Sequence, residues 1–449
     1  MELQFLGATK TVTGSKYLLT ATKKVLVDCG LFQGLKELRL RNWQRFPLNP
    51  ADINAVVLTH AHLDHSGYLP LLVKNGFRGK IYCTQATKEL CRILLLDSGH
   101  IQEEEARRAN KHGYSKHRPA LPLYTRADAE VVLPNLKALP FHEDFTFGEY
   151  QFCFKRAGHI FGAASFLVKC QDTSVLFSGD LGRTTAPCVV SPDKIAAADY
   201  LIIESTYGDR LHDQVNPKKE LSEIITRVVK RGGTVIIPTF AVGRTQAILY
   251  YIYQLKQEAG IPDVPVFLDS PMAQEITTTM LKYTDDYRYS KSFYQAACKV
   301  AHHVSSVEES KKIDASLFPK IIIASSGMLT GGRVLHHIKA FAANSRNLIL
   351  LSGYQALGTR GDTLLRGNKK IKVYGKVVTV NAEVVALSNI SAHVDYQEML
   401  AWLKEIPTPP RKVFITHGDL PAAEALRDKI QGVLHWSCDI PEYLQSVKL

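Results

Sequence analysis

Hydrophobic runs along the chain predict a succession of short strands, several of which end at a polar residue. Apolar segments at 18–20 and 24–27, broken by Gly, Thr and Lys, are typical of antiparallel strands. Further strands are predicted at 55–58, 80–83, 151–155, 174–177, 200–203 and 413–415, and a helix at 85–96. These elements predict a layered α/β domain.

The middle of the chain has a different pattern. Continuous apolar runs at 234–238, 264–268, 320–324 and 347–351 alternate with helical patterns at 245–255, 273–283 and 333–343. Strands that are apolar on both faces and alternate with helices indicate a doubly wound parallel sheet. We therefore predict an inserted domain at 207–378, with a first domain at 1–206 that resumes at 379–449.

The strand at 55–58 leads into His60-Ala61-His62-Leu63-Asp64-His65. Three imidazoles and a carboxylate within six positions are costly to bury without partners, whereas they are ordinary ligands of zinc. Four other predicted strands also end near such residues, which are His159, Asp180, Glu204 and His417. A single histidine after a strand is usually a hydrogen-bonded surface or core residue, but five ends of this kind predict one site at a common rim of the fold.

Seven candidate ligands are too many for one ion and suit two. The first zinc is expected on His60, His62 and His159, the second on Asp64, His65 and His417, with Asp180 as a bridge. Two metal ions can clamp a phosphodiester while a bridging hydroxide attacks phosphorus. Asp64 and Asp180 are thereby expected to take part in catalysis.

Three residues outside the ligand set are expected to support the chemistry. Asp28 follows the strand at 24–27 and is expected to accept a hydrogen bond from a ligand imidazole, which would orient that ring. His393 lies in a polar turn, Asn389–Asp395, and is expected to protonate the departing oxygen. Glu204 is expected to hold His393 in place.

Two Gly- and Ser-containing loops of the middle domain, 242–246 and 325–333, are candidates for phosphate contacts. The residues expected to make these contacts are Arg244, Ser325, Ser326, Gly327 and Ser391. Each loop is equally well explained as an ordinary turn between a strand and a helix. The pairs His302-His303 and His336-His337 fit no ligand pattern and are expected at the surface.

Composition narrows the class of protein. The chain has 449 residues, of which 45% are hydrophobic and 22% charged, values of a globular protein. A formal net charge of +12 favours polyanionic partners. The segment 97–118 carries many charges and predicts either a solvated helix and loop or a basic surface that holds phosphates.

The compartment is expected to be the cytoplasm. The eight cysteines contain no Cys-x-x-Cys spacing and are most simply reduced thiols. The first residues lack the pattern of a signal peptide, and no run of about 18 apolar residues predicts a membrane span.

These residues resemble the motifs of the β-CASP branch of the metallo-β-lactamase superfamily. The hexapeptide, His159, Asp180 and His417 match the superfamily's metal motifs in order, Asp28 matches its first acidic motif, and the marks of the branch fall on Glu204, His393 and His417. The resemblance implies an αββα sandwich with an inserted doubly wound β-CASP domain. It also implies a hydrolase with two Zn²⁺ ions.

Family members that act on RNA carry histidine at the last of these marks, and this chain resembles them in having His417 there. The resemblance therefore implies a zinc-dependent ribonuclease that cuts single-stranded RNA endonucleolytically, in RNA processing or decay. We expect no membrane partner, and a homodimer is the assembly to be tested. The chain looks closest to compact bacterial relatives of the pre-mRNA 3′-end cleavage nuclease, without the carboxyl-terminal domain of ribonuclease J or the amino-terminal modules of archaeal relatives. Asp362 departs from the basic residue expected after Gly361.

Other functions remain open at this point. An exoribonuclease or a DNA nuclease could share the same fold and ligands, and a catalytically silent RNA-binding subunit would also bind RNA. A hydrolase of a small thioester or lactam fits the net positive charge less well.

Overall fold

The computed structural model describes residues 1–449, which form two compact units. Unit 1 comprises Met1–Ala106, Leu121–Leu211 and Ala392–Leu449, and unit 2 comprises Arg107–Ala120 and His212–Ser391. The domain limits predicted from the sequence, 1–206, 207–378 and 379–449, stay a proposal.

Unit 1 contains two seven-stranded sheets. In spatial order, the first consists of β22 (Ser446–Lys448), β1 (Glu2–Phe5), β2 (Tyr17–Thr20), β3 (Lys24–Val27), β4 (Ala55–Val57), β5 (Lys80–Thr84) and β6 (Leu136–Leu139). The second consists of β21 (Cys438–Asp439), β20 (Lys412–Thr416), β11 (Tyr200–Glu204), β10 (Thr173–Phe177), β9 (Ala164–Cys170), β8 (Tyr150–Arg156) and β7 (Asp144–Phe147).

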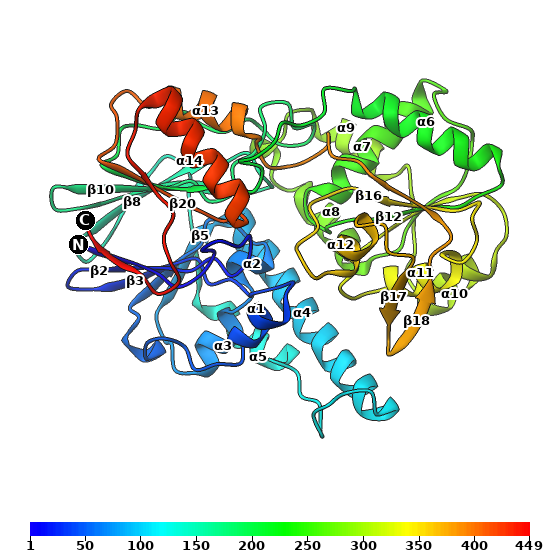
Figure 1. Ribbon diagram of the computed structural model, residues 1–449, viewed down its shortest axis with the longest axis horizontal. Helices are drawn as coiled ribbons and strands as arrows, with labels where there is room; N and C mark the ends of the chain where they lie inside the picture. The colour runs from blue at the N-terminus through cyan, green and yellow to red at the C-terminus, as the bar shows by residue number, and fades with distance from the viewer. The chain divides into compact units, whose positions relative to one another are not determined.

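The two sheets bury one core between them. Leu19 and Val25 of the first sheet and Phe166 and Val175 of the second belong to the same buried cluster and are 0% exposed. Helices lie on the outer sides of the sheets (Figure 1). They are α1 (Lys36–Arg41), α2 (Leu63–Ser66), α3 (Leu69–Lys74), α4 (Gln85–His112) and α5 (Arg126–Glu130) on the first, α13 (Tyr396–Lys404) and α14 (Leu420–Leu434) on the second, with short 3₁₀ helices η1 (Pro50–Asp52) and η2 (Leu133–Asn135).

This arrangement is the αββα sandwich that the sequence predicts. Strands β3 and β4 pair in parallel, and so do β10, β11 and β20. The carboxyl ends of parallel strands lie at the same edge of a sheet. The loops that carry the polar residues of the predicted site therefore start from common edges.

Unit 2 contains a six-stranded sheet in which every pair is parallel. Its spatial order is β14 (His302–His303), β13 (Val266–Leu268), β15 (Ile321–Ala324), β12 (Val235–Pro238), β16 (Leu348–Leu351) and β19 (Glu383–Ala386). The connecting helices are α6 (Pro217–Lys230), α7 (Arg244–Gln257), α8 (Pro271–Met280), η3 (Thr284–Asp286), α9 (Lys291–Cys298), α10 (Val307–Ala315), α11 (Val334–Phe341) and α12 (Arg360–Leu365), and β17 (Lys370–Val373) and β18 (Lys376–Thr379) form a separate hairpin.

All residues of β12, β15 and β16 are buried, which explains their continuous apolar runs. The predicted doubly wound parallel sheet is confirmed, and with it the fold class as a whole. No helix of the structure combines the length and hydrophobicity needed to cross a bilayer.

The helix predicted at 85–96 is present and continues to His112, because the charged residues that follow Asp97 are good helix formers. The segment 97–118 is thus a helix followed by a loop, one of the two interpretations given for it. One local prediction was wrong. His337, predicted at the surface, is fully buried, because α11 turns it inward on the same stripe as Val334 and Ile338.

Candidate metal centre

Four of the seven candidate ligands lie in the hexapeptide, which backbone hydrogen bonds from neighbouring segments hold in place. Strand β4 ends two residues before Thr59, and α2 begins at Leu63. The backbone oxygen of Asp64 accepts a hydrogen bond from Ser15 N at 2.8 Å, and that of His65 accepts one from Cys29 N at 2.6 Å. A Cβ on Gly30 would lie 1.5 Å from the Asp64 oxygen, so only glycine allows this approach.

The first predicted ligand group is brought together in the structure. His60 Nε2 and His159 Nε2 lie 3.1 and 3.2 Å from His62 Nδ1. Asp180 Oδ2 lies 3.4 Å from His60 Nε2 and 3.6 Å from His159 Nε2. Four potential donor atoms therefore converge within 4.8 Å of one another.

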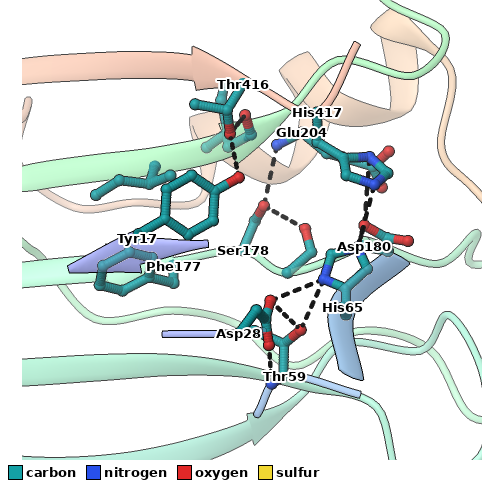
Figure 2. Close-up of a pocket in the computed structure, with 13 residues that line it drawn as sticks. Tyr17, Asp28, Thr59, His65, Phe177, Ser178, Asp180, Glu204, Thr416 and His417 are labelled. Atoms are coloured by element: carbon teal, nitrogen blue, oxygen red, sulfur yellow. Dashed lines mark hydrogen bonds and ion pairs between the residues drawn. The ribbon is translucent and has the colours of Figure 1, made fainter. Parts of the chain in front are cut away.

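The second predicted group lies on the other side of Asp180. His65 Nε2 is 3.1 Å from His417 Nε2, and His417 Nε2 is 3.6 Å from Asp64 Oδ2. Asp180 Oδ1 lies 3.1 Å from His65 Nε2. One carboxylate thus directs one oxygen toward each group, which is the position of a bridging ligand. Figure 2 shows Asp180 with His65 and His417 of the second group.

The chemistry of these side chains fits two zinc ions. Burial lowers the pKa of His60 and His159 well below its usual value and lowers that of His62, so these rings are neutral at neutral pH, the form that binds metals. Burial opposes a charge on His65, but the charges of Asp180 and Asp28 raise the pKa of His65 well above its usual value. A site that favours a proton there also favours a metal cation, and imidazole and carboxylate ligands suit zinc.

Asp28 lies behind His65. Its Oδ2 is 2.7 Å from His65 Nδ1, and its two oxygens accept hydrogen bonds of 2.8 Å from the N–H and the hydroxyl of Thr59. Asp28 has a φ of 55°, in the left-handed region that Asp tolerates better than most residues. The backbone therefore turns this carboxylate toward the hexapeptide (Figure 2).

His393 and Glu204 form a second pair, with His393 Nδ1 2.9 Å from Glu204 Oε2; the His393 side chain is 16% exposed and that of Glu204 is 2% exposed. Glu204 Oε1 accepts a hydrogen bond from Leu181 N, and Glu204 Oε2 also accepts one from the Thr206 hydroxyl. Burial opposes the charge of His393, but the charge and hydrogen bond of Glu204 outweigh burial and raise the pKa of His393 above its usual value. The His393 ring lies beside the His159 ring, with centroids 4.4 Å apart.

The backbone around His393 is tied to unit 1. His393 forms an isolated β-bridge with Gly182, and Val394 N donates to Leu181 O at 3.0 Å. Asp395 caps the N-terminus of α13, two residues after His393. These backbone contacts hold the His393 imidazole in position, although His393 does not lie in a named strand.

Sequence reasoning missed several hydroxyl side chains of the site. Ser15 Oγ lies 3.3 Å from His65 Nε2, and Thr206 Oγ1 lies 3.3 Å from His417 Nδ1. Tyr17 donates to Thr416 Oγ1 at 3.0 Å in the small pocket behind the second ligand group (Figure 2). Ser, Thr and Tyr are common along the chain, so only their position after a strand or beside a ligand could have indicated them.

The predicted phosphate contacts lie in unit 2. Arg244 begins α7 after β12, and Ser325 to Gly327 follow β15, the parallel neighbour of β12, so these two loops share one edge of the sheet. Ser326 Oγ accepts hydrogen bonds from Thr330 N at 2.9 Å and Gly331 N at 3.3 Å. Ser391 follows β19, where its N–H donates to Ser388 O at 3.3 Å. Their role toward phosphate stays a prediction.

Comparison with known families matches three parts of the chain. Residues 12–220 match the model of the metallo-beta-lactamase superfamily, residues 245–364 that of the Beta-Casp domain, and residues 377–441 that of the Zn-dependent metallo-hydrolase RNA specificity domain. The three matches follow one another along most of the sequence.

Individual relatives cover the chain nearly end to end. It is 34% identical over 424 residues to ribonuclease TTHA0252 of Thermus thermophilus, covering 92% of each protein. It is 32% identical over 469 residues to transcription termination factor FttA of Methanosarcina mazei, covering 99% of this chain and 71% of that protein. An RNase J-like protein of Methanocaldococcus jannaschii is 31% identical over 414 residues, 89% of this chain and 88% of that protein.

A crystal structure of a protein of unknown function from Enterococcus faecalis V583 has a similar fold. Its TM-score is 0.55 at 14% identity, with 100% of this chain and 99% of that chain covered. From the matched families and the extent of the relatives, the chain belongs to the β-CASP ribonuclease branch of the metallo-β-lactamase superfamily.

Proposed function

We propose that this protein is a zinc-dependent ribonuclease that hydrolyses phosphodiester bonds within single-stranded RNA. The observation that carries the proposal is the position of the His393–Glu204 pair beside two ligand groups that share Asp180. Hydrolysis needs an activated water on one side of phosphorus and a proton for the leaving oxygen on the other. The proposed ligands and His393 would supply the two requirements.

The geometry supports the proposed ligand roles. His60, His62 and His159 would hold one zinc, Asp64, His65 and His417 the other, and Asp180 both. Zinc, when bound, lowers the pKa of a coordinated water to about 7, so that hydroxide is available at neutral pH. Asp28 would keep the Nδ1 proton of His65 in place, which directs the Nε2 lone pair of that ring toward the second ion.

His393 would act as the general acid. Its Nδ1 proton is bonded to Glu204, so its Nε2 is the atom that would carry a proton to the leaving oxygen. Leu181 N and Thr206 fix Glu204 in turn. Glu204 is therefore a positioning residue that also favours the protonated imidazole of His393.

RNA is the substrate that the comparisons support. Ribonuclease TTHA0252 is similar over 92% of this chain, and the matched RNA specificity domain covers residues 377–441. A net charge of +12 suits a polyanion. Cutting within a strand, in RNA processing or decay, follows from the resemblance to the pre-mRNA 3′-end cleavage nuclease.

The experiment that tests this function uses zinc-loaded protein with 5′-labelled and 3′-labelled single-stranded RNA and matched DNA. We expect internal products from both RNA labels and little cleavage of DNA. A ladder that starts from one end would identify an exonuclease, and preferential cutting of DNA would identify a DNA nuclease. No hydrolysis at full zinc content would contradict the proposal and favour an RNA-binding subunit.

The general acid is tested separately by His393→Ala. We expect this variant to keep its zinc and to lose cleavage by about 10²-fold or more. Asp180→Ala is expected to lose both zinc and cleavage. His100→Ala, which removes an exposed histidine of α4, serves as the matched control and should cut at the parent rate.

The compartment and assembly are also proposals. All eight cysteines are free, which suits a reducing compartment such as the cytoplasm. We retain a homodimer as the assembly to be tested by light scattering of the purified protein.

A further inference from the structure

Two distant segments of the sequence form one surface of unit 2. The first is the C-terminal end of α4 with the loop that follows, 107–120, and the second is the β17–β18 hairpin (Figure 1). The Arg108 guanidinium lies 3.9 Å from the centre of the Tyr374 ring. A Cβ on Gly375 would lie 3.3 Å from Tyr114, so the tyrosine ring packs on the turn of the hairpin. We call residues 107–120 and 366–379 the α4–hairpin surface.

The α4–hairpin surface is strongly cationic. Residues 107–120 contain five Lys or Arg and no Asp or Glu, and residues 366–379 contain five more and again no acid. Arg366 forms an ion pair of 2.8 Å with Asp362, an acid that lies outside these two segments. Seven exposed cations are not in any ion pair of the structure, and they are Lys111, Lys116, Arg118, Lys369, Lys370, Lys372 and Lys376. An ordinary solvated face mixes both signs of charge, which this surface does not.

The strand that carries Lys370 and Lys372 is anchored in the core of unit 2. Ile371 and Val373 are 4% and 0% exposed and belong to the core of unit 2. Lys370 and Lys372 alternate with them and so point to the opposite, exposed face, about 7 Å apart along the strand. Val377, opposite Lys372 on that face, is 67% exposed. Because the strand is ordered beforehand, a ligand would lose little free energy in ordering its backbone.

We propose that the α4–hairpin surface binds the phosphate backbone of RNA through contacts separate from those of the metal centre, an inference that rests on the proposed ribonuclease function. Unpaired cations on one surface attract a polyanion and release its counterions. Tyr114 is 39% exposed and supplies an aromatic face within the basic loop, on which a base can stack. Phosphate contacts carry no sequence information, so the surface holds RNA of any sequence.

Direct binding tests the proposal. The probe is fluorescein-labelled polyuridylate, the protein is zinc-loaded and carries His393→Ala to keep the probe intact, and anisotropy is measured over a series of salt concentrations. The hairpin variant combines Lys369→Ala, Lys370→Ala, Lys372→Ala and Lys376→Ala. Its matched control replaces four exposed lysines of unit 1 that are in no ion pair, namely Lys23→Ala, Lys169→Ala, Lys404→Ala and Lys448→Ala.

The hairpin variant is expected to bind about tenfold more weakly or worse, whereas the control changes little. The slope of log K against log salt should fall by about 0.7 for each phosphate that the variant no longer neutralises, and so by up to about 3 for four lysines. An independent variant of the loop, Lys111→Ala with Lys116→Ala and Arg118→Ala, should weaken binding in the same direction. Equal melting temperatures would show that the variants are folded.

Equal affinities and salt slopes for the hairpin, loop and control variants would overturn the proposal. Cleavage is measured in parallel with His393 restored, where the hairpin variant should show a higher KM for long RNA and an unchanged kcat. Absence of cleavage in the parent protein would contradict the ribonuclease function alone, because the binding comparison does not depend on hydrolysis.

Discussion

Asp28 and His65 form a buried pair in which Asp28 Oδ2 lies 2.7 Å from His65 Nδ1, while Nε2 of the same ring faces Asp180 and His417 at 3.1 Å. The carboxylate fixes the proton on Nδ1 and leaves the lone pair of Nε2 for a ligand. One hydrogen bond therefore sets which nitrogen is available in the proposed centre.

Asp28→Asn should lower zinc affinity about 10- to 100-fold. Asn tolerates the φ of 55° at this position, and its amide oxygen can still accept the bond from Thr59 N, so the backbone is expected to persist. The lost features are the negative charge behind His65 and the oxygen that accepts the Nδ1 proton of this ring, because an NH₂ group would replace Oδ2. Competition with a chromophoric chelator measures the affinity, with the exposed Asp172→Asn as the control. An affinity equal to that of the parent would refute the role given to Asp28.

Removal of zinc should lower the melting temperature as well as stop cleavage. A ligand that binds only the folded state stabilises it by about 2.7 kcal/mol when present at 100 times its Kd. We expect Zn²⁺ to restore both properties and Mg²⁺ to restore neither, because five of the seven proposed ligands are imidazoles. Calorimetry of chelated and reloaded protein provides the measurement. Recovery with Mg²⁺ alone would speak against a zinc centre.

Gly182→Ala should destabilise the centre from a position that holds no ligand. A Cβ there would lie 1.8 Å from Gly158 O, so the backbone that carries His159 would have to move. We expect a loss of about 1–3 kcal/mol in the free energy of unfolding, as for other overpacked sites, together with weaker zinc binding. Gly432→Ala is the control, because nothing lies within 4 Å of a Cβ at that helical position. It should gain about 0.5–1 kcal/mol. Urea unfolding distinguishes the two results.

His337 should make the stability of the protein depend on pH. Burial opposes its charge, but hydrogen bonds with Asp269 at 2.9 Å and Asp314 at 2.6 Å raise the pKa of His337 in the folded state. The folded protein therefore binds the proton more tightly than the unfolded chain, whose pKa is about 6.5. This stabilisation is complete below pH ~6.5 and is lost as the pH rises through the folded pKa.

Urea unfolding of the parent and of His337→Gln checks this prediction. The free energy of unfolding is measured from about pH 6 to about pH 9, with chelator present throughout. We expect a difference of about 3 kcal/mol at the acidic end, as for a broken buried ion pair, that shrinks toward the alkaline end. Arg333, 2.6 Å from Asp269, should keep that carboxylate ionised in both proteins. A difference independent of pH would rule out titration of His337 as the cause.

The parts that were predictable from the sequence share a physical origin. A strand that is buried on both faces has to be apolar, so β12 and β15 are visible as apolar runs, and their parallel pairing follows from the helices between them. His60 and Asp180 were predictable as candidate site residues because a polar side chain a few residues after the buried end of a strand lies at a sheet edge.

The parts that were not predictable depend on partners far away in the sequence. The burial of His337 on the apolar stripe of α11 is compensated by Asp269 and Asp314 from two other elements, and no local pattern indicates that pairing. Thr206 likewise becomes part of the site through contacts with Glu204 and His417. The contact of Arg108 with Tyr374 is equally invisible to a local pattern, so the charged stretch after Asp97 gave no sign of its neighbour.

The order of the proposed ligands along the chain has a consequence for translation. The hexapeptide leaves the ribosome early, His159 and Asp180 follow, and His417 emerges only after the whole of unit 2. The second ligand group is incomplete until then. If the chain is the two-zinc ribonuclease proposed above, a nascent chain would load one ion early but not the pair, and so would not cut the message that encodes it while most of that message is being read.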